Sequence, residues 1–299
     1  NLTDELQRFE NLEIAIGSAS LLGRMERESR ADVPTLSLQL RGNEVALESL
    51  QALVGLVAGD TSLSAVLDHS IALDIKADRF LAFGESAAGV SAALAIKDGL
   101  LTLSRLNIAA LDGATLSASG TLGGSLLAPS AGLDMTVKAA AMRPVAELLS
   151  RHLPAHPVLA RFLAAAGYYD NADLAIRLAS SGEAGDPATV TISGPVNDGR
   201  VEMKLSATTP ADLLAGRNFE LEGSIFNPQS VVLAGQMGLD PLPFDADPDG
   251  SVTFRVKQRE EGPADVSLVF SAGSTTISAK GTAALSAADF PAGMLALSA

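Results

Sequence analysis

The chain contains no cysteine and no tryptophan among its 299 residues, and aromatic residues make up only 4% of it. Without cysteine there is no disulfide framework, no thiolate nucleophile and no cysteine-ligated metal. Few aromatic side chains are present on which the bases of single-stranded nucleic acid could stack. The formal net charge of −14 argues the same way, because phosphate backbones are bound mainly by lysine and arginine. We therefore expect no nucleic-acid partner.

Membrane spans and catalytic patterns are missing as well. No stretch reaches the ~20 apolar residues that a membrane-spanning helix needs, and no signal peptide begins the chain. The sequence starts at Asn1 and its alternating pattern continues to both ends, so we expect a piece of a longer polypeptide whose membrane anchor lies elsewhere. Without a G-x-S-x-G elbow or a cysteine nucleophile, we predict no enzymatic activity and no cofactor.

Histidine is scarce too, with three residues in the chain. His152 and His156 have the spacing of helical metal ligands, but Pro154 and Pro157 interrupt a helix there. His69 follows an aspartate at an expected helix end, where an imidazole can bond the last carbonyl groups. We predict capping or joining roles for all three histidines and no metal site.

The chain has plenty of apolar residues, 47% of the total, and many of them alternate with polar ones. This period of two predicts half-buried β-strands. Tight turns join the segments at Asp98–Gly99, at Asp112–Gly113 and at Asn197–Gly199, since glycine tolerates positive φ. The expected strands are Ile71–Ala77, Val90–Ile96, Leu101–Ile108, Ala114–Gly120, Leu174–Leu178, Thr189–Ile192, Val201–Leu205, Val252–Lys257, Val266–Phe270 and Thr275–Lys280.

Helical patterns interrupt the strands three times, at intervals of roughly 90 residues, which is the length of a supersecondary unit of several strands. The expected helices begin at Asn43, at Arg143–Pro144 and at Asn227–Pro228, with further short helices over Ser62–Leu67 and Pro157–Ala166.

We predict a mainly β fold from this organisation: an elongated repeat of antiparallel strands forming an open curved sheet or groove, with short helices inserted between strand groups. The run Leu116–Leu122 returns in degenerate form as Ile277–Ala283, and we read Gly120–Gly124 as a turn because it lacks the Lys–Ser/Thr pair of a phosphate loop. The whole chain is expected to form one continuous region, 1–299, with approximate units 1–69, 70–168, 169–249 and 250–299.

Two consecutive stretches, Lys97–Leu106 and Leu111–Leu122, carry a family pattern. Each begins at an Asp–Gly turn, the first turn reads D-G-x-L-x-L, and a further strand and helix follow over Ala131–Leu149. In these features the larger part of the chain resembles the AsmA-like family of bacterial envelope proteins. Members of that family have an N-terminal inner-membrane helix and a long periplasmic part, and the larger ones look like β-grooves that carry phospholipids toward the outer membrane.

The resemblance implies a compartment, a ligand and a role. It implies a periplasmic segment, anchored to the inner membrane through a part of the protein absent from this chain. Its partners would be phospholipid acyl chains, and its role would be phospholipid transport and outer-membrane homeostasis. It implies no particular oligomeric state.

The apolar face of such strands must be covered, either by a ligand or by the protein itself. In an open trough, acyl chains would lie against it. In a closed sandwich the same residues meet each other, and the chain would be a structural or adhesive β-repeat segment of a surface protein. The residues predicted to line a lipid groove are Leu73, Ile75, Leu94, Ile96, Leu101, Leu103, Ile108, Leu174, Ile176 and Leu178.

An acidic calcium-dependent module is a third possibility, because Asp245–Gly250 has the acidic spacing of a calcium loop. The twelfth position of that loop, where a bidentate glutamate closes the shell, is Val256. We therefore predict the same thermal unfolding midpoint in about a millimolar calcium and in chelator. Because a ligand that binds only the folded state raises the midpoint, an upward shift that disappears in Asp247→Ala would contradict this expectation.

Overall fold

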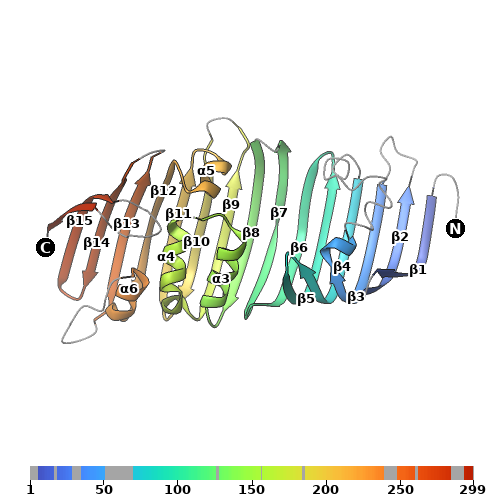
Figure 1. The fold of residues 1–299 in the computed structure, drawn as a ribbon, viewed down its shortest axis with the longest axis horizontal. Coiled ribbons are helices and arrows are strands. Elements are labelled where there is room, and N and C mark those ends of the chain that lie inside the picture. The colour runs from blue at the N-terminus through green and yellow to red at the C-terminus, as the bar shows by residue number, and fades with distance from the viewer. Residues whose placement is uncertain are drawn as a thin grey trace. The chain divides into compact units, whose positions relative to one another are not determined.

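The chain is mainly β, as the alternating pattern predicted (Figure 1). Contacts divide it into two compact units, unit 1 with Asn1–Leu111 and Thr115–Met135, and unit 2 with Asp112–Ala114 and Thr136–Ala299. Each unit holds an open sheet whose strands are hydrogen-bonded in chain order. The expected division at residues 69, 168 and 249 stays a prediction. The computed structural model describes residues 6–16, 19–28, 35–50, 70–125, 128–155, 157–183, 186–238, 248–259, 262–283 and 293–298.

Unit 1 is built from long strands, most of them antiparallel to their neighbours. The exception is the parallel pair β3 and β4, which needs a crossover connection, and helical residues follow β3 at 47–50. The strands are β1 (Leu6–Ile16), β2 (Ala19–Glu28), β3 (Thr35–Ala46), β4 (Ser70–Ala82), β5 (Glu85–Lys97), β6 (Leu100–Leu111), β7 (Ala114–Ser125) and β8 (Ala128–Ala139), which ends in unit 2.

The prediction of a helix beginning at Asn43 is wrong, because β3 continues through that residue to Ala46. Val45 is fully buried and packs in one cluster with Leu40 and Ile75. Extending the strand through Val45 therefore buries apolar surface, which stabilises the strand over a helix at this position. The helix expected over Ser62–Leu67 lies outside the described residues.

A β-bulge in β6 determines which face of the unit 1 sheet the following side chains of that strand point to. The register with β5 shifts between Ala93 and Leu94, which leaves Ser104 as an extra residue. As a result Leu103 and Ile108 lie on the same face, although strict alternation would place residues five apart on opposite faces. The expectation that both belong to one apolar face therefore depends on a bulge that the sequence pattern does not show.

The turn predicted at Gly120–Gly124 is also wrong, because β7 runs on to Ser125. Gly120 has φ +155, and a Cβ atom there would lie 2.0 Å from the carbonyl oxygen of Gly132 in β8. Only glycine allows the two backbones to approach this closely. The matching glycine of the second copy, Gly281, lies inside β15 in the same way.

Unit 2 adds helices to its strands at the connections (Figure 1). The elements are α3 (Arg143–His152), α4 (Pro157–Ala165), the 3₁₀-helix η1 (Ala166–Tyr169), β9 (Ala172–Ser180), β10 (Ala188–Val196), β11 (Gly199–Ala207), α5 (Pro210–Ala215), β12 (Phe219–Asn227), α6 (Ser230–Gln236), β13 (Gly250–Gln258), β14 (Ala264–Ala272), β15 (Thr275–Ala283) and β16 (Gly293–Ser298). The helices expected at Arg143–Pro144 and over Pro157–Ala166 are confirmed.

The helix start expected at Asn227–Pro228 is wrong, and Asn227 does not cap α6. It is buried at the end of β12, and α6 begins only at Ser230. Its Oδ1 accepts a hydrogen bond from the N–H of Gln229 at 2.9 Å, and its Nδ2 donates to the carbonyl of Asn197 at 2.8 Å. Asn227 thus ties the β12–α6 connection to the β10–β11 turn.

The short helix α5 is held by its two caps. The Thr209 hydroxyl accepts from the N–H of Asp212 at 3.0 Å, Pro210 is the first helical residue, and Gly216 ends the helix with φ 64. Between the caps, Leu213 packs into the core of unit 2. The caps therefore position the side chain that covers one end of the sheet.

We expect Thr209→Ala to lower the free energy of unfolding by about 1 kcal/mol, because an N–H of the first turn loses its acceptor. Thr208→Ala is the matched control, an exposed neighbour with the same side chain and no capping role, and should change stability by less than ~0.5 kcal/mol. Urea unfolding of the three proteins measures both values. Equal losses for the two variants would show that the cap contributes nothing.

Candidate functional site

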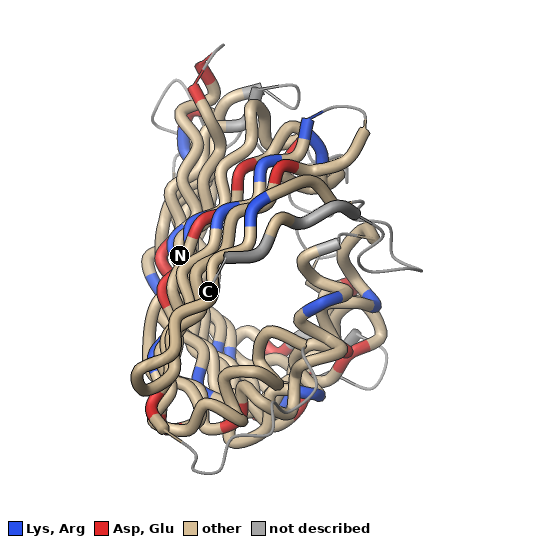
Figure 2. Tube along the Cα trace, turned by 90° about the vertical axis from the view of Figure 1, so that its left-hand side faces the viewer, with Lys and Arg blue, Asp and Glu red and all other residues tan. Residues whose placement is uncertain are grey.

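The sheet of unit 2 has one apolar and one polar face. Side chains of Ile192, Met203 and Phe254 define what we call the inner face, and the polar residues between them, such as Lys204 and Arg255, define the outer face. The helices lie on the inner side, toward which the strands bend (Figure 2).

Two rows of apolar residues cross the middle of the inner face from β9 to β14. Each row joins residues that are directly paired on neighbouring strands, and none of these residues is charged or polar. We call them the middle rows. The first consists of Ile176, Ile192, Met203, Gly223, Phe254 and Leu268, and the second of Leu178, Val190, Leu205, Leu221, Val256 and Val266.

The middle of the sheet is more exposed than its margins, which is the reverse of the pattern in a closed core. Both middle rows are partly exposed throughout. The rows at the two ends of the strands are buried: Val201 and Ile225 are 1% and 2% exposed at one end, and Ala207 and Phe219 are 2% and 1% exposed at the other. A closed sandwich would bury the middle of the sheet most deeply. This distribution is that of a trough with covered margins and an open centre.

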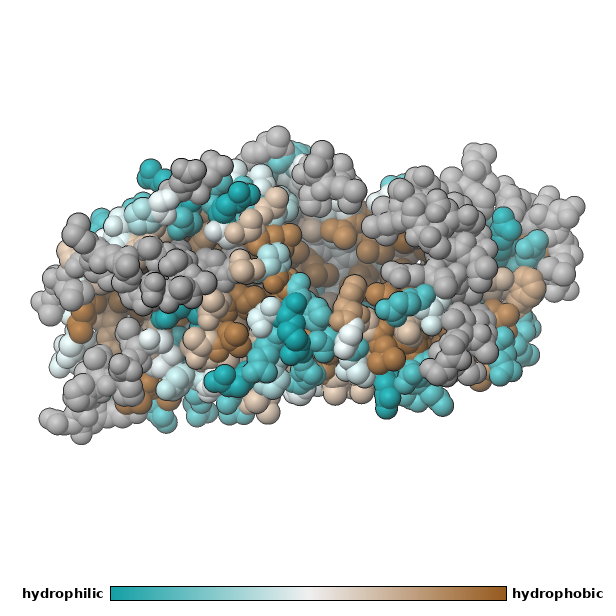
Figure 3. Space-filling view, viewed as in Figure 1, coloured by the Kyte–Doolittle hydropathy of each residue, from teal (hydrophilic) through white to brown (hydrophobic). Residues whose placement is uncertain are grey.

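Helices from the strand connections cover the two margins. At one end, Leu213 of α5 and Val158 of α4 pack with Ala207 and Phe219. At the other, the Leu233 side chain of α6 lies against Gly250, where an added Cβ would be 2.8 Å from the Leu233 Cδ2. Apolar side chains gather between these elements on the helix-bearing side, and over β6 and β7 of unit 1 the surface is hollowed (Figure 3).

A glycine lowers the floor of the trough on β12. An added Cβ at Gly223 would lie 2.9 Å from Cζ of Phe254 and 3.0 Å from Cγ of Met203. The phenyl ring of Phe254 therefore occupies the space that a side chain at position 223 would fill. The first middle row thus stays apolar across β12 although Gly223 has no side chain.

The predicted lining residues share one face within each unit, but their exposure differs. In unit 1, Ile75 and Ile96 are buried in two separate clusters, and in unit 2 Leu174 is buried at a margin. The remaining predicted residues are partly exposed: Leu73, Leu94, Leu101, Leu103, Ile108, Ile176 and Leu178. The residues of β10–β14 in the middle rows were missed, although the same alternation marks them.

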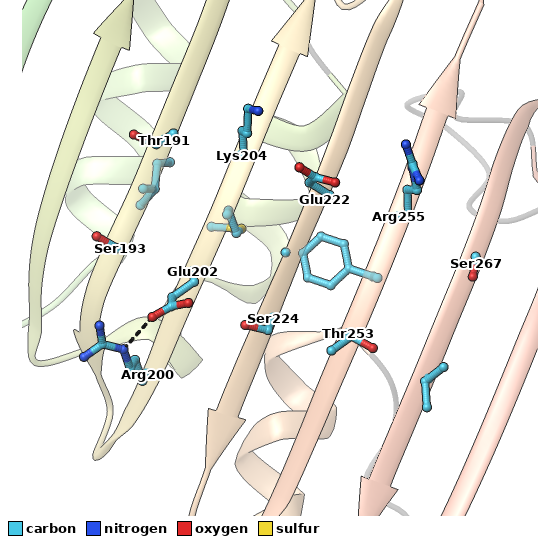
Figure 4. A pocket seen from close by; sticks show the side chains of 15 residues that line it. Thr191, Ser193, Arg200, Glu202, Lys204, Glu222, Ser224, Thr253, Arg255 and Ser267 are labelled. Carbon is cyan, nitrogen blue, oxygen red and sulfur yellow. Dashed lines mark hydrogen bonds and ion pairs between the residues drawn. The ribbon is translucent and has the colours of Figure 1, made fainter.

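The outer face of unit 2 carries a polar hollow of about 700 Å³. Figure 4 shows its side chains on neighbouring strands, with hydroxyl groups such as those of Ser224 and Thr253 between longer charged residues. Arg200 pairs with Glu202 at 2.9 Å, and Arg255 pairs with Glu220. The arginines of both pairs are largely exposed, which weakens the pairs, and the surface resembles the ordinary polar side of an antiparallel sheet.

Metal sites and membrane spans are not found in the described parts of the chain. There, no three His, Cys, Asp or Glu residues come together in a way that could hold a metal ion. His152 lies in the last turn of α3, whereas His69, His156 and Asp245–Asp247 fall outside the described residues. The helices seen in these parts are too short or too polar to cross a membrane.

Comparison of the chain with protein-family models, with curated proteins and with solved structures finds no match.

Two positions on β11 test whether the centre of the inner face is open. Val201 and Met203 lie two residues apart on the same face, one buried and one partly exposed. We expect Val201→Arg to lower the free energy of unfolding by more than ~3 kcal/mol, since it buries an unpaired charge. Met203→Arg should cost less than ~1 kcal/mol, because its guanidinium can reach solvent through the trough.

Urea unfolding of both variants against the wild type gives the comparison. Losses of equal size at the two positions would mean that the middle rows are as closed as the margins.

Proposed function

We propose that this chain is a non-enzymatic, lipid-binding segment of a periplasmic AsmA-like envelope protein. In this proposal, a part of the protein outside the chain anchors it to the inner membrane, and the whole takes part in phospholipid transport and outer-membrane homeostasis. The family and the compartment are supported by the resemblance of Lys97–Leu106 and Leu111–Leu122 to the family pattern. The ligand class is supported by the inner face of unit 2.

The observation that carries the proposal is the partial exposure of two uncharged rows between buried margins. Apolar side chains held open in a rigid sheet favour a ligand without polar groups along its length. An acyl chain gains ~0.8 kcal/mol for each CH₂ group that it removes from water. The inner face can therefore hold acyl chains by burial alone, while a polar headgroup stays in solvent.

The dimensions agree with an acyl chain lying across the strands. From β9 to β14 the middle rows cross five inter-strand spacings, roughly 24 Å at ~4.8 Å each. One leaflet accounts for about half of the ~30 Å hydrocarbon core of a bilayer. One acyl chain therefore fits along a middle row with length to spare.

The alternative function, a structural or adhesive β-repeat segment with a closed core, draws its support from unit 1. There the predicted lining residues Ile75 and Ile96 are 3% and 8% exposed and pack within the protein. A surface protein built of such units needs no ligand. The two functions differ in whether lipid accompanies the folded protein.

We predict that native mass spectrometry of the gently purified protein shows bound phospholipid. Met203→Arg should stay folded and lose most of this lipid, because it places a charge in the first middle row. The matched control is Thr253→Arg, which adds the same charge to the outer face and should keep the wild-type lipid content.

A wild-type protein that stays free of lipid after incubation with phospholipid vesicles would overturn the proposal. So would equal lipid loss in both arginine variants, since the outer face takes no part in the binding proposed here.

A further inference from the structure

Helix α4 and the following η1 run along the strands over the inner face of unit 2. At one end, Val158 packs against the buried cluster of Ala188, Ala207, Leu213 and Phe219 at one margin. At the other, the carbonyl of Tyr168 accepts a hydrogen bond of 3.2 Å from Nδ2 of Asn197, the residue after β10. The segment Pro157–Tyr169, which we call the strap, is therefore attached near both margins of the inner face.

The strap is fastened to α6 by a set of hydrogen bonds that we call the clasp. Arg161 donates from Nη2 to the carbonyl of Met237 at 2.8 Å, and the Tyr169 hydroxyl donates to the carbonyl of Gln236 at 3.1 Å. In return, Nε2 of Gln236 donates to the carbonyl of Tyr168 at 3.0 Å. The last carbonyls of a helix have no partner within it, so the strap supplies the donors that α6 lacks.

Packing makes the clasp specific. Gly235 is buried, and a Cβ atom added to it would lie 2.3 Å from the ring of Tyr168, so only glycine accepts the ring there. The ring of Tyr169 meets that of Phe162 edge to face with centroids 5.6 Å apart. Burial raises the pKa of Tyr169 to about 12, so its hydroxyl remains a donor at neutral pH.

Between its two attachments the strap leaves the first middle row partly exposed, as it does the second. Before the strap the chain passes through exposed residues, Leu153–Ala155, after α3 has ended in extended backbone at Leu153. The strap is thus attached at its ends, spans the apolar rows and has an exposed connection at its start.

We propose that Pro157–Tyr169 is a strap that holds an apolar chain on the middle rows, and that opening of the clasp sets the rate at which the chain leaves. This inference rests on the proposed function and adds its regulation. With the clasp closed, a bound chain lies between the strap and the sheet. Release then requires the hydrogen bonds to α6 to break, while the capacity of the trough stays the same.

Two clasp variants test this inference. Tyr169→Phe and Arg161→Met each remove a donor to a carbonyl at the C-terminal end of α6 and leave the middle rows intact. Transfer of a phospholipid with a fluorescent acyl chain from the protein to acceptor vesicles is followed by stopped flow. Each variant should release the probe ~10-fold faster, the effect of losing one hydrogen bond. The amount bound, measured by native mass spectrometry, should equal that of the wild type.

Ala160→Gly is the matched control, because it weakens α4 at an exposed position outside the clasp. Its release rate should stay within about twofold of the wild type, given that the clasp donors remain. Unchanged release in the clasp variants, or an equal rise in Ala160→Gly, overturns the strap while lipid binding stands. A wild type that binds no probe overturns the proposed function and the strap with it.

Discussion

Cross-strand register is the constraint on which the structure of unit 2 depends. The middle rows exist because every strand from β9 to β14 presents its apolar residues at the same height. A slip of one residue in any strand would turn its whole apolar set to the outer face. The β10–β11 turn resists such a slip, since Asn197 and Asp198 adopt φ 44 and 61, the backbone of a tight two-residue hairpin. In unit 1 the bulge at Ser104 likewise keeps the apolar residues of β6 on one face.

Once the rows are aligned, the size of their side chains decides where helices can sit. One margin carries three alanines, Ala188, Ala207 and Ala264, which are almost fully buried beside Phe219. Small side chains let α4 and α5 approach the backbone there through Val158 and Leu213. The middle rows carry larger residues, which hold a covering element further from the sheet.

Alternation predicted the strands well, because apolar residues at every second position place one whole face of a strand where it can be buried. Predictions that depended on one local residue were less secure. Asn227 has the side chain of a helix cap, yet its Oδ1 accepts from the N–H of Gln229, in the connection before α6. Helix α5 was missed because six residues are too few to show a helical period, although Thr209–Pro210 is a recognisable start. The clasp at Tyr169 arises from contacts between distant segments, which no single stretch of sequence encodes. The bulge at Ser104 lies within the β5–β6 hairpin, but the alternation of apolar residues does not reveal it.

The difference between margin and middle is what the sequence could not supply. Val201 and Met203 are both apolar, share a face and belong to the same alternating pattern, but only the first is sealed by the protein. Their environments diverge because α6, α5 and the ends of the strap all contact the strand ends, where the connections leave the sheet. These elements therefore bury the margins, whereas the middle rows below the strap stay partly exposed. An open apolar centre follows from this topology, and water makes it costly unless a ligand covers it.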